Sequence, residues 1–346
     1  MSNRVFITRP ILPKGIALLE GHGIEVIIGQ SDGNAPITRP RLLDGIRKAG
    51  ALICHLSERI DREVLETNPT LCGVATYAVG YNNIDVAAAT ELGLPVSNTP
   101  DVLTEATADL TWALLLAVAR RIPAAHRFTV EGRFAIWNPV LFLGDDVGPG
   151  GTGRRKVLGI VGFGRIGRAV ARRAAGFDMD VLAHDPSRRE MIVAGGLARW
   201  SEVDELVAAS DFLSLHAPLT PLTRHMIGER QLRAMKPSAY LVNAARGPLV
   251  DERALVRALQ EGWIAGAALD VYEHEPELAA GLATLSNVVL APHIGSATRE
   301  TREEMAAIVA RNTIAHLRGE RAPQAVNPEV YAGSAWKMRR RPERGA

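Results

Sequence analysis

Short apolar runs and stretches of helical periodicity alternate along the first hundred residues. Runs of four or five apolar residues are typical of buried strands, and apolar residues three or four positions apart are typical of helices. The expected strands are Val5–Thr8, Ile24–Ile28, Ala51–Cys54, Gly73–Thr76 and Leu94–Ser97, and the expected helices are Gly15–Glu20, Arg39–Ala49 and Asp85–Leu92. Strands that alternate with helices predict a parallel α/β sheet.

A second alternating array follows the first. Between them the pattern predicts a long helix that begins near Asp101 or Thr104 and ends at Pro123, and then an irregular stretch. Segment 144–153 contains too many glycines for regular structure. The later strands are expected at 156–161, 179–183, 211–215, 239–243, 266–270 and 288–291, and a last helix at 299–317. The predicted fold class is therefore α/β, with two doubly wound parallel sheets.

A glycine-rich turn lies between the strand at 156–161 and a helix expected at 168–175. It reads Gly162-Phe163-Gly164-Arg165-Ile166-Gly167, and Asp185 follows after a further short apolar stretch. Glycines at this spacing more often mark simple turns. A preceding strand, a following helix and a distal acid together predict a dinucleotide site. The N–H groups that open the helix would bind the pyrophosphate, and the acid would accept hydrogen bonds from the adenosine ribose.

Composition and charge narrow the class of protein. The chain has 346 residues, of which 47% are hydrophobic, and a formal net charge of +2. These values are typical of a globular protein of about two domains and give no reason to expect a nucleic-acid partner. The basic residues from Lys337 onward are expected to form a solvated tail rather than a binding arm. No metal site is expected.

Several features bear on the compartment. Cys54 and Cys72 lie in apolar surroundings and form no CxxC motif, so we expect free thiols in a reducing compartment. The first ten residues lack the apolar core of a signal peptide. The longest strongly apolar run, Leu110–Ala119, is too short to cross a bilayer. The expectation is a cytoplasmic protein with no membrane partner.

Arg246, Glu275 and His293 each lie a few residues beyond the end of a different predicted strand of the second array. Ligands of parallel sheets bind beyond the carboxyl ends of the strands. Reduction of a 2-keto acid needs a cation to hold the carboxylate, a histidine to protonate the carbonyl oxygen, and an acid to favour the imidazolium form.

Each of the three residues also has a plainer interpretation. Arg246 would be a surface residue after a turn. Glu275 would be a solvated loop acid, as Glu273 is expected to be. His293 would be a histidine whose hydrogen bonds are satisfied beside a glycine turn. Their joint placement favours chemistry. Because a separate α/β array precedes the cofactor unit, the active site is expected in a cleft between the two.

Six segments match one family: Tyr77–Asp85, Asn98–Thr104, Gly162–Gly167, Asn243–Gly247, Asp270–Pro276 and Pro292–Ser296. Through them the chain resembles the D-isomer-specific 2-hydroxyacid dehydrogenase family, from about Val5 to Val326. Within the family it is most similar to the glyoxylate/hydroxypyruvate reductases. One departure is Gly148–Arg155, which is longer than the corresponding connection in most relatives.

The resemblance implies a domain organisation and an oligomeric state. It implies a flavodoxin-like substrate domain at 1–102, completed by 296–330, and a Rossmann dinucleotide-binding domain at 103–295. Residues 331–346 would form the basic tail, which is expected to be disordered. The family forms homodimers through the long helix between the arrays, and Trp137 would reach into the neighbouring subunit's pocket. Simple packing of this tryptophan in an apolar loop is the alternative.

The resemblance also assigns roles to site residues. Arg246 would bind substrate, His293 would act as acid/base, and Glu275 would be its partner. Backbone N–H groups around Val79 and Gly80 would hold the substrate carboxylate. The remaining expected site residues are Leu56 and Ser57 at the side-chain end of the substrate pocket, Asp270 at the nicotinamide end of the cofactor, and His216, Ala217, Pro218, Ala244 and Ala245 along the cofactor cleft.

The residue at the ribose position bears on the choice of cofactor. NADP-using glyoxylate reductases usually lack an acid there, whereas this chain has Asp185. A carboxylate repels a 2′-phosphate and accepts hydrogen bonds from a 2′-hydroxyl, so NAD(H) is favoured. NADP(H) is still possible, because Arg188 and Arg189 are close enough in sequence to clamp that phosphate.

The expected activity is NAD(P)H-dependent reduction of glyoxylate or hydroxypyruvate to the 2-hydroxy acid. Alternatives within the family are reduction of another 2-keto acid, such as 2-ketogluconate, and oxidation of phosphite. Formate dehydrogenases of this fold place a glutamine beside the histidine, so Glu275 argues against that activity. An alternative of another class is a non-catalytic NADH-sensing protein, similar to the corepressors built on this scaffold.

Overall fold

The chain forms two compact units. The computed structural model describes residues 2–339. As far as they are described, Met1–Leu103 and Ala297–Ala346 form one unit, and Thr104–Ser296 form the other. The family resemblance predicts domain boundaries after residues 102 and 295, and the boundaries between the two units come one residue later, after 103 and 296.

Within the described residues, a five-stranded parallel sheet runs through the first unit. Its strand order, β2-β1-β3-β4-β5, is the flavodoxin-type doubly wound order. The strands are β1 (Arg4–Ile7), β2 (Glu25–Ile28), β3 (Ala51–Cys54), β4 (Val74–Thr76) and β5 (Val96–Ser97), and the helices are α1 (Pro13–Gly21), α2 (Arg39–Arg47), α3 (Arg62–Glu66), α4 (Val86–Glu91), α12 (Arg299–Arg318) and α13 (Ser334–Arg339). The predicted α/β class is confirmed for this unit.

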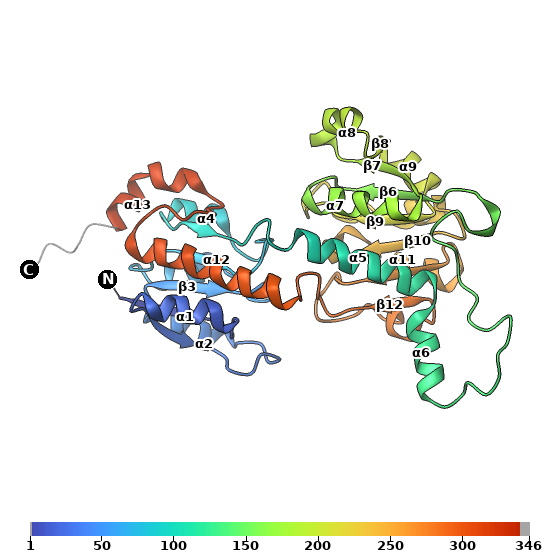
Figure 1. Cartoon of the computed structure of the whole chain (residues 1–346). Coiled ribbons are helices and arrows are strands. Elements are labelled where there is room, and N and C mark those ends of the chain that lie inside the picture. The colour runs from blue at the N-terminus through green and yellow to red at the C-terminus, as the bar shows by residue number, and fades with distance from the viewer. Residues whose placement is uncertain (1, 340–346) are drawn as a thin grey trace, which may run out of the picture. The chain divides into compact units, whose positions relative to one another are not determined.

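Helices cover both faces of this sheet (Figure 1). Successive side chains of a strand point to opposite faces. In β1, Val5 and Ile7 therefore pack with α1 and α12, whereas Phe6 packs with α2 on the other face. Figure 1 shows α1 and α12 side by side, although nearly the whole chain separates them. The beginning and the end of the chain thus share one core.

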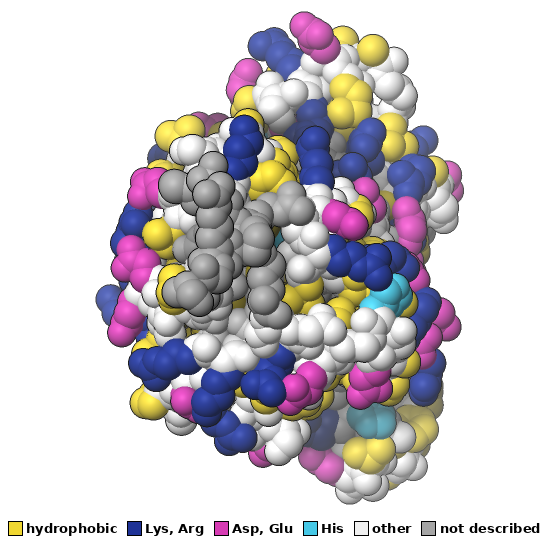
Figure 2. All heavy atoms as spheres, turned by 90° about the vertical axis from the view of Figure 1, so that its left-hand side faces the viewer, with side chains coloured by type: hydrophobic (Ala, Val, Ile, Leu, Met, Phe, Trp, Pro, Cys, Tyr) yellow, Lys and Arg dark blue, Asp and Glu magenta, His cyan; other side chains and the backbone are white. Residues whose placement is uncertain are grey.

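Basic and acidic side chains are interspersed on the face shown in Figure 2. Ion pairs of the first unit include Lys14 with Glu304 at 2.9 Å and Lys48 with Asp44 at 2.8 Å. This mixed surface agrees with the near-balanced charge of the sequence. Among the described residues, no helix has the length and apolar character needed to cross a membrane.

The second unit holds a seven-stranded parallel sheet within the described residues, in the order β12-β11-β10-β9-β6-β7-β8. This is the Rossmann order with one added strand, because β6 lies inside the sheet and the chain then winds outward to β7 and β8 on one side and to β9–β12 on the other. The strands are β6 (Val157–Val161), β7 (Asp180–His184), β8 (Arg199–Trp200), β9 (Phe212–Leu215), β10 (Tyr240–Asn243), β11 (Gly266–Leu269) and β12 (Val288–Leu290), and the helices are α5 (Thr104–Ala119), α6 (Ile122–Val130), α7 (Arg165–Ala174), α8 (Arg189–Gly195), α9 (Val203–Ala209), α10 (Glu229–Ala234) and α11 (Glu252–Gln260). The predicted Rossmann fold is confirmed.

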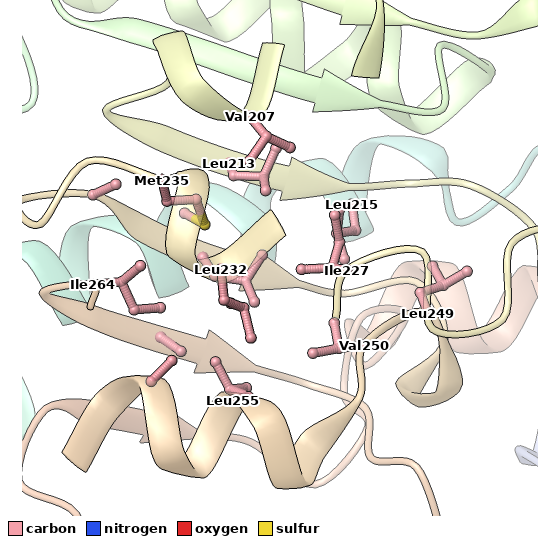
Figure 3. Packing of buried hydrophobic residues seen from close by; sticks show 14 of the residues in the cluster. Val207, Leu213, Leu215, Ile227, Leu232, Met235, Leu249, Val250, Leu255 and Ile264 are labelled. Atoms are coloured by element: carbon pink, nitrogen blue, oxygen red, sulfur yellow. The ribbon is translucent and has the colours of Figure 1, made fainter. Parts of the chain in front are cut away.

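The two faces of this sheet carry separate clusters of buried residues. On one face Leu213 and Leu215 of β9 pack with Leu232 of α10 and Leu255 of α11 (Figure 3). On the other face Phe212 belongs to the cluster that α5 and α7 cover. Successive side chains of β9 therefore point into different cores, one on each face of the sheet.

The predicted end of the long helix is wrong. The helix α5 ends at Ala119, and Arg121 has a left-handed φ of 52°, which breaks the helical path. Pro123 lies in the first turn of the next helix, α6, where the sequence predicted an irregular stretch. Proline is tolerated there because the first N–H groups of a helix have no intrahelical partner. The proline therefore starts a helix rather than ending one.

Two predictions of irregular structure also differ from the structure. Within the glycine-rich segment, Gly150–Thr152 form a turn of 3₁₀-helix. Residues 331–339 were assigned to a disordered tail, but they belong to the 3₁₀-helix Pro328–Ala332 and to α13. Tyr331 and Trp336 make an edge-to-face contact, with ring centroids 5.1 Å apart, which gives this segment packing of its own. Residues 340–346 lie outside the described residues.

Candidate active site

The glycine-rich turn joins β6 to α7, and its glycines meet different needs. Gly162 has a φ of 91°, and a Cβ there would lie 2.4 Å from the backbone N of Ala217. A Cβ at Gly167 would lie 2.1 Å from the carbonyl oxygen of Gly162. No atom lies within 4 Å of a Cβ built at Gly164, at the start of α7. This open position fits a dinucleotide, whose pyrophosphate must approach the backbone closely at a helix N-terminus.

Asp185 follows β7 and is bonded to the same turn. One carboxylate oxygen accepts the N–H of Phe163 at 2.9 Å, and the other accepts the N–H and the hydroxyl of Ser187 at 3.1 and 2.7 Å. Arg188 pairs with it at 3.0 Å. Burial alone would raise the pKa of Asp185, but the bonds from Ser187, Phe163 and Arg188 together lower it below its usual value. The turn therefore carries a fixed negative charge at its outer end.

The segment after β9, His216–Pro218, lies directly against Gly162. The Nε2 atom of His216 is 2.8 Å from the hydroxyl of Ser214, and burial lowers the pKa of this imidazole to about 3. The side chain is therefore neutral near pH 7 and does not compete with the catalytic histidine candidate. The backbone of His216 and Ala217 lies against Gly162 of the glycine-rich turn, and the lining of a cofactor cleft by this segment stays a prediction.

Arg246 leaves the end of β10 in a turn that Asn243 organises. The buried amide of Asn243 accepts the N–H of Ala245 at 3.1 Å and donates to the carbonyl of Arg246 at 2.9 Å. Ala244 and Ala245 are half-buried within this turn. Burial lowers the pKa of Arg246, and the negative charge of Glu275 raises it in part. An arginine remains protonated at neutral pH in any such environment.

Glu275 and His293 are in direct contact. The distance between Oε2 of Glu275 and Nδ1 of His293 is 2.8 Å, and Oε1 of Glu275 accepts the N–H of Tyr272 at 3.0 Å. Burial would raise the pKa of Glu275, but the bond from His293, the N–H of Tyr272 and the charge of Arg246 together lower it. The carboxylate is therefore ionised at neutral pH. Because Nδ1 is occupied, Nε2 is the nitrogen of His293 that can serve a substrate.

Asp270 holds the backbone on which His293 stands. Its two carboxylate oxygens accept the N–H groups of Ile294 and Gly295 at 2.7 and 2.8 Å. The side chain is 1% exposed, and burial raises its pKa. The carbonyl of Gly295 is bonded in turn by the hydroxyl of Thr107 in α5, at 3.1 Å. The family resemblance predicts that Asp270 contacts the cofactor. In the structure, its carboxylate accepts hydrogen bonds from the loop that carries the imidazole of His293.

The comparison with protein families agrees with this geometry. The family model described as "D-isomer specific 2-hydroxyacid dehydrogenase, NAD binding domain" matches residues 112–295. That range is more than half of the chain and contains the glycine-rich turn and the Arg246, Glu275 and His293 positions. The chain belongs to this family. It is therefore a 2-hydroxyacid dehydrogenase, an oxidoreductase that uses a nicotinamide cofactor to reduce 2-keto acids.

Relatives support the assignment over nearly the full length. Two are described as glyoxylate reductases: one from Thermococcus gammatolerans, 51% identical over 95% of this chain and 97% of its own, and one from Thermococcus kodakarensis, 52% identical over 95% and 98%. Among solved structures, the TT0316 protein from Thermus thermophilus has a TM-score of 0.85 and 41% identity, and covers 93% of this chain and 99% of its own. An NADPH-dependent glyoxylate/hydroxypyruvate reductase from Sinorhizobium meliloti, in complex with NADP and malonate, has a TM-score of 0.78 and 30% identity, and covers 95% of this chain and 98% of its own.

The substrate residues expected outside the Rossmann unit of this dehydrogenase follow the strands of the first unit. Val79 and Gly80 follow β4 and are half-buried, and the carbonyl of Val79 accepts a bond from the amide of Asn98 at 2.8 Å. Leu56 and Ser57 follow β3 and are exposed. All four lie at the carboxyl edge of their sheet, where ligands of parallel sheets bind.

A buried network behind Leu56 and Ser57 was not predicted. Glu58 is 6% exposed, and its carboxylate accepts bonds from the hydroxyls of Thr8 and Ser57 at 2.8 and 2.7 Å and from the N–H of His55 at 2.6 Å. Burial alone would raise the pKa of Glu58, but these bonds lower it. The sequence does not show that Glu58 is buried, because an acid beside loop residues has the same local pattern whether it is buried or exposed.

Trp137 is 74% exposed, so the alternative of simple packing within its own loop does not describe it. It lies among other exposed apolar side chains of the segment after α6, namely Phe134, Ile136, Val140 and Leu143. Nearby is a cavity of about 520 Å³, lined by residues of α5 and α6 and by residues at the start of β10 and β12, including Val118, Phe128, Tyr240 and Val289. This cavity lies at the amino edge of the sheet, whereas Arg246 and His293 follow the carboxyl ends.

Proposed function

We propose that this dehydrogenase reduces glyoxylate or hydroxypyruvate to the corresponding 2-hydroxy acid, with NADH as the reductant. The observation that carries the proposal is the Nδ1–Oε2 bond of 2.8 Å between His293 and Glu275, with the guanidinium of Arg246 close enough for its charge to affect the carboxylate. The names of the similar glyoxylate reductases support the substrate. An acid, an imidazole and a cation together meet the needs of carbonyl reduction.

His293 supplies the proton in this proposal. Glu275 holds Nδ1, which leaves Nε2 to face the carbonyl oxygen of the substrate. A nicotinamide cofactor held at the glycine-rich turn would supply the hydride that the carbonyl carbon accepts. As negative charge develops on the oxygen, the proton moves from Nε2 to it, and a neutral imidazole remains until it is protonated again.

Arg246 binds and polarises the substrate. Its Nη1 donates to the carbonyl of Ala245 at 2.5 Å, which fixes the guanidinium and leaves further N–H groups for a carboxylate and a carbonyl oxygen. Backbone N–H groups around Val79 and Gly80 would also bind the substrate carboxylate. Leu56 and Ser57 would limit the length of the substrate side chain.

The residues present fit a dinucleotide, and NAD(H) is the proposed form. The carboxylate of Asp185 is ionised and fixed beside the turn, so it repels a 2′-phosphate and accepts bonds from a 2′-hydroxyl. Arg188 is already paired with this carboxylate, which reduces its capacity to bind a phosphate. The similar reductase from Sinorhizobium meliloti is NADPH-dependent, and the ratio of kcat/KM with NADH to that with NADPH tests the proposed preference of this chain.

A homodimer is part of the proposal. Phe134, Ile136 and Trp137 expose a continuous apolar stretch, which is unusual for a surface that faces only water. A second copy of the chain would cover this stretch and fill the cavity at the amino edge of the sheet. Sedimentation of the full chain would then give twice the monomer mass. A monomer at micromolar concentration would contradict this part of the proposal.

The cysteines support a cytoplasmic location. Cys54 and Cys72 form no disulfide bond, and Cys54 is buried, which raises the pKa of its thiol. A thiol of this kind packs as an apolar side chain and does not react. Free cysteines are typical of proteins in reducing compartments.

Steady-state kinetics tests the proposal. The rates with glyoxylate, hydroxypyruvate, 2-ketogluconate and, in the oxidative direction, phosphite would be measured with each of the two cofactors. We expect the highest kcat/KM with glyoxylate or hydroxypyruvate and NADH. His293→Ala should lower kcat at least about a hundred-fold and leave the Kd of NADH unchanged. Tight NADH binding without turnover of any acid would instead favour the cofactor-sensing alternative.

A further inference from the structure

Three side chains behind the Glu275–His293 pair have no part in the proposed chemistry. Glu273 was predicted to be a solvated loop acid, but its side chain is only 13% exposed. One of its carboxylate oxygens lies 2.6 Å from Nε2 of His225, and the other accepts the N–H of Glu252 at 3.3 Å. In return, the buried carboxylate of Glu252 accepts the N–H of Glu273 at 2.6 Å. We refer to Glu273, Glu252 and His225 as the acid clamp.

The acid clamp joins segments that follow three adjacent strands. His225 comes after β9, Glu252 begins α11 after β10, and Glu273 comes after β11. The segments after β9 and β10 also pair through an isolated β-bridge between Ile227 and Val250. The side chains of these two residues lie in one apolar cluster (Figure 3). These segments carry, in the same order, the cofactor-lining residues, the substrate arginine and the acid partner of the histidine.

The clamp fixes the peptide group between Tyr272 and Glu273 from both sides. The N–H of this group bonds Glu252, and its carbonyl lies so close to Gly247 that a Cβ there would be 1.8 Å away. The preceding N–H, that of Tyr272, donates to Oε1 of Glu275. Since Oε2 of the same carboxylate bonds the imidazole, the hydrogen bonds on either side of residue Tyr272 link the start of α11 to the catalytic histidine candidate.

Two carboxylates this close would repel each other without compensation. Burial and the charge of Glu273 raise the pKa of Glu252, and the N–H of Glu273 lowers it in part. The carboxylate of Glu273 is stabilised by its contact with the imidazole of His225. It is also stabilised by the N–H of Glu252 at the start of α11, where the helix dipole favours negative charge. The three residues therefore depend on one another, and the loss of one releases the turn that they hold.

We propose that Glu273 is a positioning residue for 2-keto acid reduction: held by Glu252 and His225, it fixes the turn from Tyr272 to Glu275 and so holds the Glu275 carboxylate against His293. This inference rests on the proposed roles of Glu275 and His293. Glu273 touches no reacting atom in the proposal and acts only through Glu275.

A double-mutant cycle in the full chain tests this inference. Glu273→Ala is expected to lower kcat for glyoxylate on the order of ten-fold, because a small displacement of the carboxylate aligns the imidazole poorly. The KM for glyoxylate should change less than about two-fold, because Arg246 keeps its own turn. In a Glu275→Gln background the same substitution should cause little further loss. Equal losses in both backgrounds would overturn the inference, since independent residues act additively.

Two other variants control the experiment. Glu277→Ala removes an exposed acid from the same loop and should leave kcat unchanged. Glu273→Gln keeps an oxygen for the N–H of Glu252 but loses the charge that pairs with His225, so a smaller loss than with alanine is expected. If Glu273→Ala fails to fold, the cycle is completed with Glu273→Gln and with His225→Asn, and the same criterion of non-additivity applies.

A measurement without turnover separates the inference from the proposed function. In protein labelled with ¹⁵N-histidine, the proton on Nδ1 of His293, assigned by its loss in His293→Ala, should weaken or disappear in Glu273→Ala and persist in Glu277→Ala. An unchanged resonance in Glu273→Ala would contradict the positioning role even if the enzyme is active. Loss of the resonance in a chain that reduces no 2-keto acid would contradict the proposed function alone.

Discussion

At the scale of single residues, the imidazole proposed to move the proton depends on a neighbour that moves none. His293 has a left-handed φ of 56°, a conformation that costs a non-glycine residue on the order of 1 kcal/mol. Asp270 accepts the next two N–H groups, those of Ile294 and Gly295, and so holds this conformation. The direction of the imidazole is therefore a property of Asp270 as much as of His293 itself.

A substitution of Arg246 tests the substrate side of the site. Arg246→Ala should raise the KM for glyoxylate and lower kcat, with a loss in kcat/KM on the order of a hundred-fold, because the carboxylate and the developing oxyanion lose the same donor. Arg246→Lys should restore only part of the loss, since an ammonium cannot reproduce the two-pronged bond. Arg253→Ala, which removes an exposed charge from α11, is the matched control. Unchanged kinetics in Arg246→Ala would exclude the proposed role.

Residues of the site differ in how far the sequence alone could reveal them. Asp185 could be predicted because its place depends on one strand and one turn that are close in sequence. Glu273 could not, because its burial depends on Glu252 and His225, which are 21 and 48 residues away and follow other strands. A lone acid in a loop has the same local pattern whether it is buried or solvated. Its contacts are set by the sheet order, which periodicity does not give.

At the scale of elements, helix α1 packs against α12 through a contact that only glycine permits. A Cβ at Gly15 would lie 2.6 Å from the carbonyl oxygen of Ala306 in α12. Gly21, at the end of the same helix, has no atom within 4 Å of the corresponding position. The two glycines of α1 therefore differ in role: Gly15 permits a close helix contact and Gly21 does not take part in one.

This difference gives a paired prediction about stability. Gly15→Ala should lower the free energy of unfolding by about 1–3 kcal/mol, because the added methyl group forces α1 away from α12. Gly21→Ala should leave it unchanged or raise it by up to about 1 kcal/mol, through the lower backbone entropy of the unfolded chain. Urea denaturation of both variants measures the difference. Equal effects would mean that the helices do not approach as closely as described.

The elements that were predicted well differ physically from those that were not. Strands such as β3 and β10 are buried along their whole length, so a continuous apolar run marks them. Helix α3 has five residues, too few to show a period, and α6 buries none of its side chains. A helix shows an apolar period in the sequence only when one of its faces is buried in the core of its own chain, because only then are apolar residues needed at regular positions. Exposed apolar residues of α6, such as Ile122 and Val130, instead suit the proposed dimer.

At the scale of the whole molecule, periodicity predicts two α/β arrays but not that the last helix returns to the first. Helix α12 packs on β3 and β4, and its Met305 and Val309 fill the same core as Val5. The expectation that residues 296–330 complete the first domain came from the family resemblance. An amphipathic helix shows which of its faces is buried, but its pattern does not say which sheet covers that face.

Both units bury histidines, which predicts how stability depends on pH. Burial lowers the pKa of His55 and His316 in the first unit to about 4, and that of His216 in the second to about 3. In the unfolded chain each has a pKa of about 6.5. Below that pH the unfolded state binds protons that the folded state does not, so stability is lost as the pH falls from about 6.5 towards 4.

His316 allows this dependence to be measured at one residue. Its Nε2 lies 2.9 Å from the hydroxyl of Ser97, and its ring packs against Gly73. Each such histidine contributes at most about 1.4 kcal/mol per pH unit to the slope of unfolding free energy against pH. Because glutamine does not titrate, His316→Gln should be less stable at pH 8 but should show a shallower slope between pH 6.5 and 5 in urea denaturation. His274→Gln, at an exposed position, should keep the wild-type slope. A wild-type slope in His316→Gln would show that this imidazole is already protonated in the folded chain.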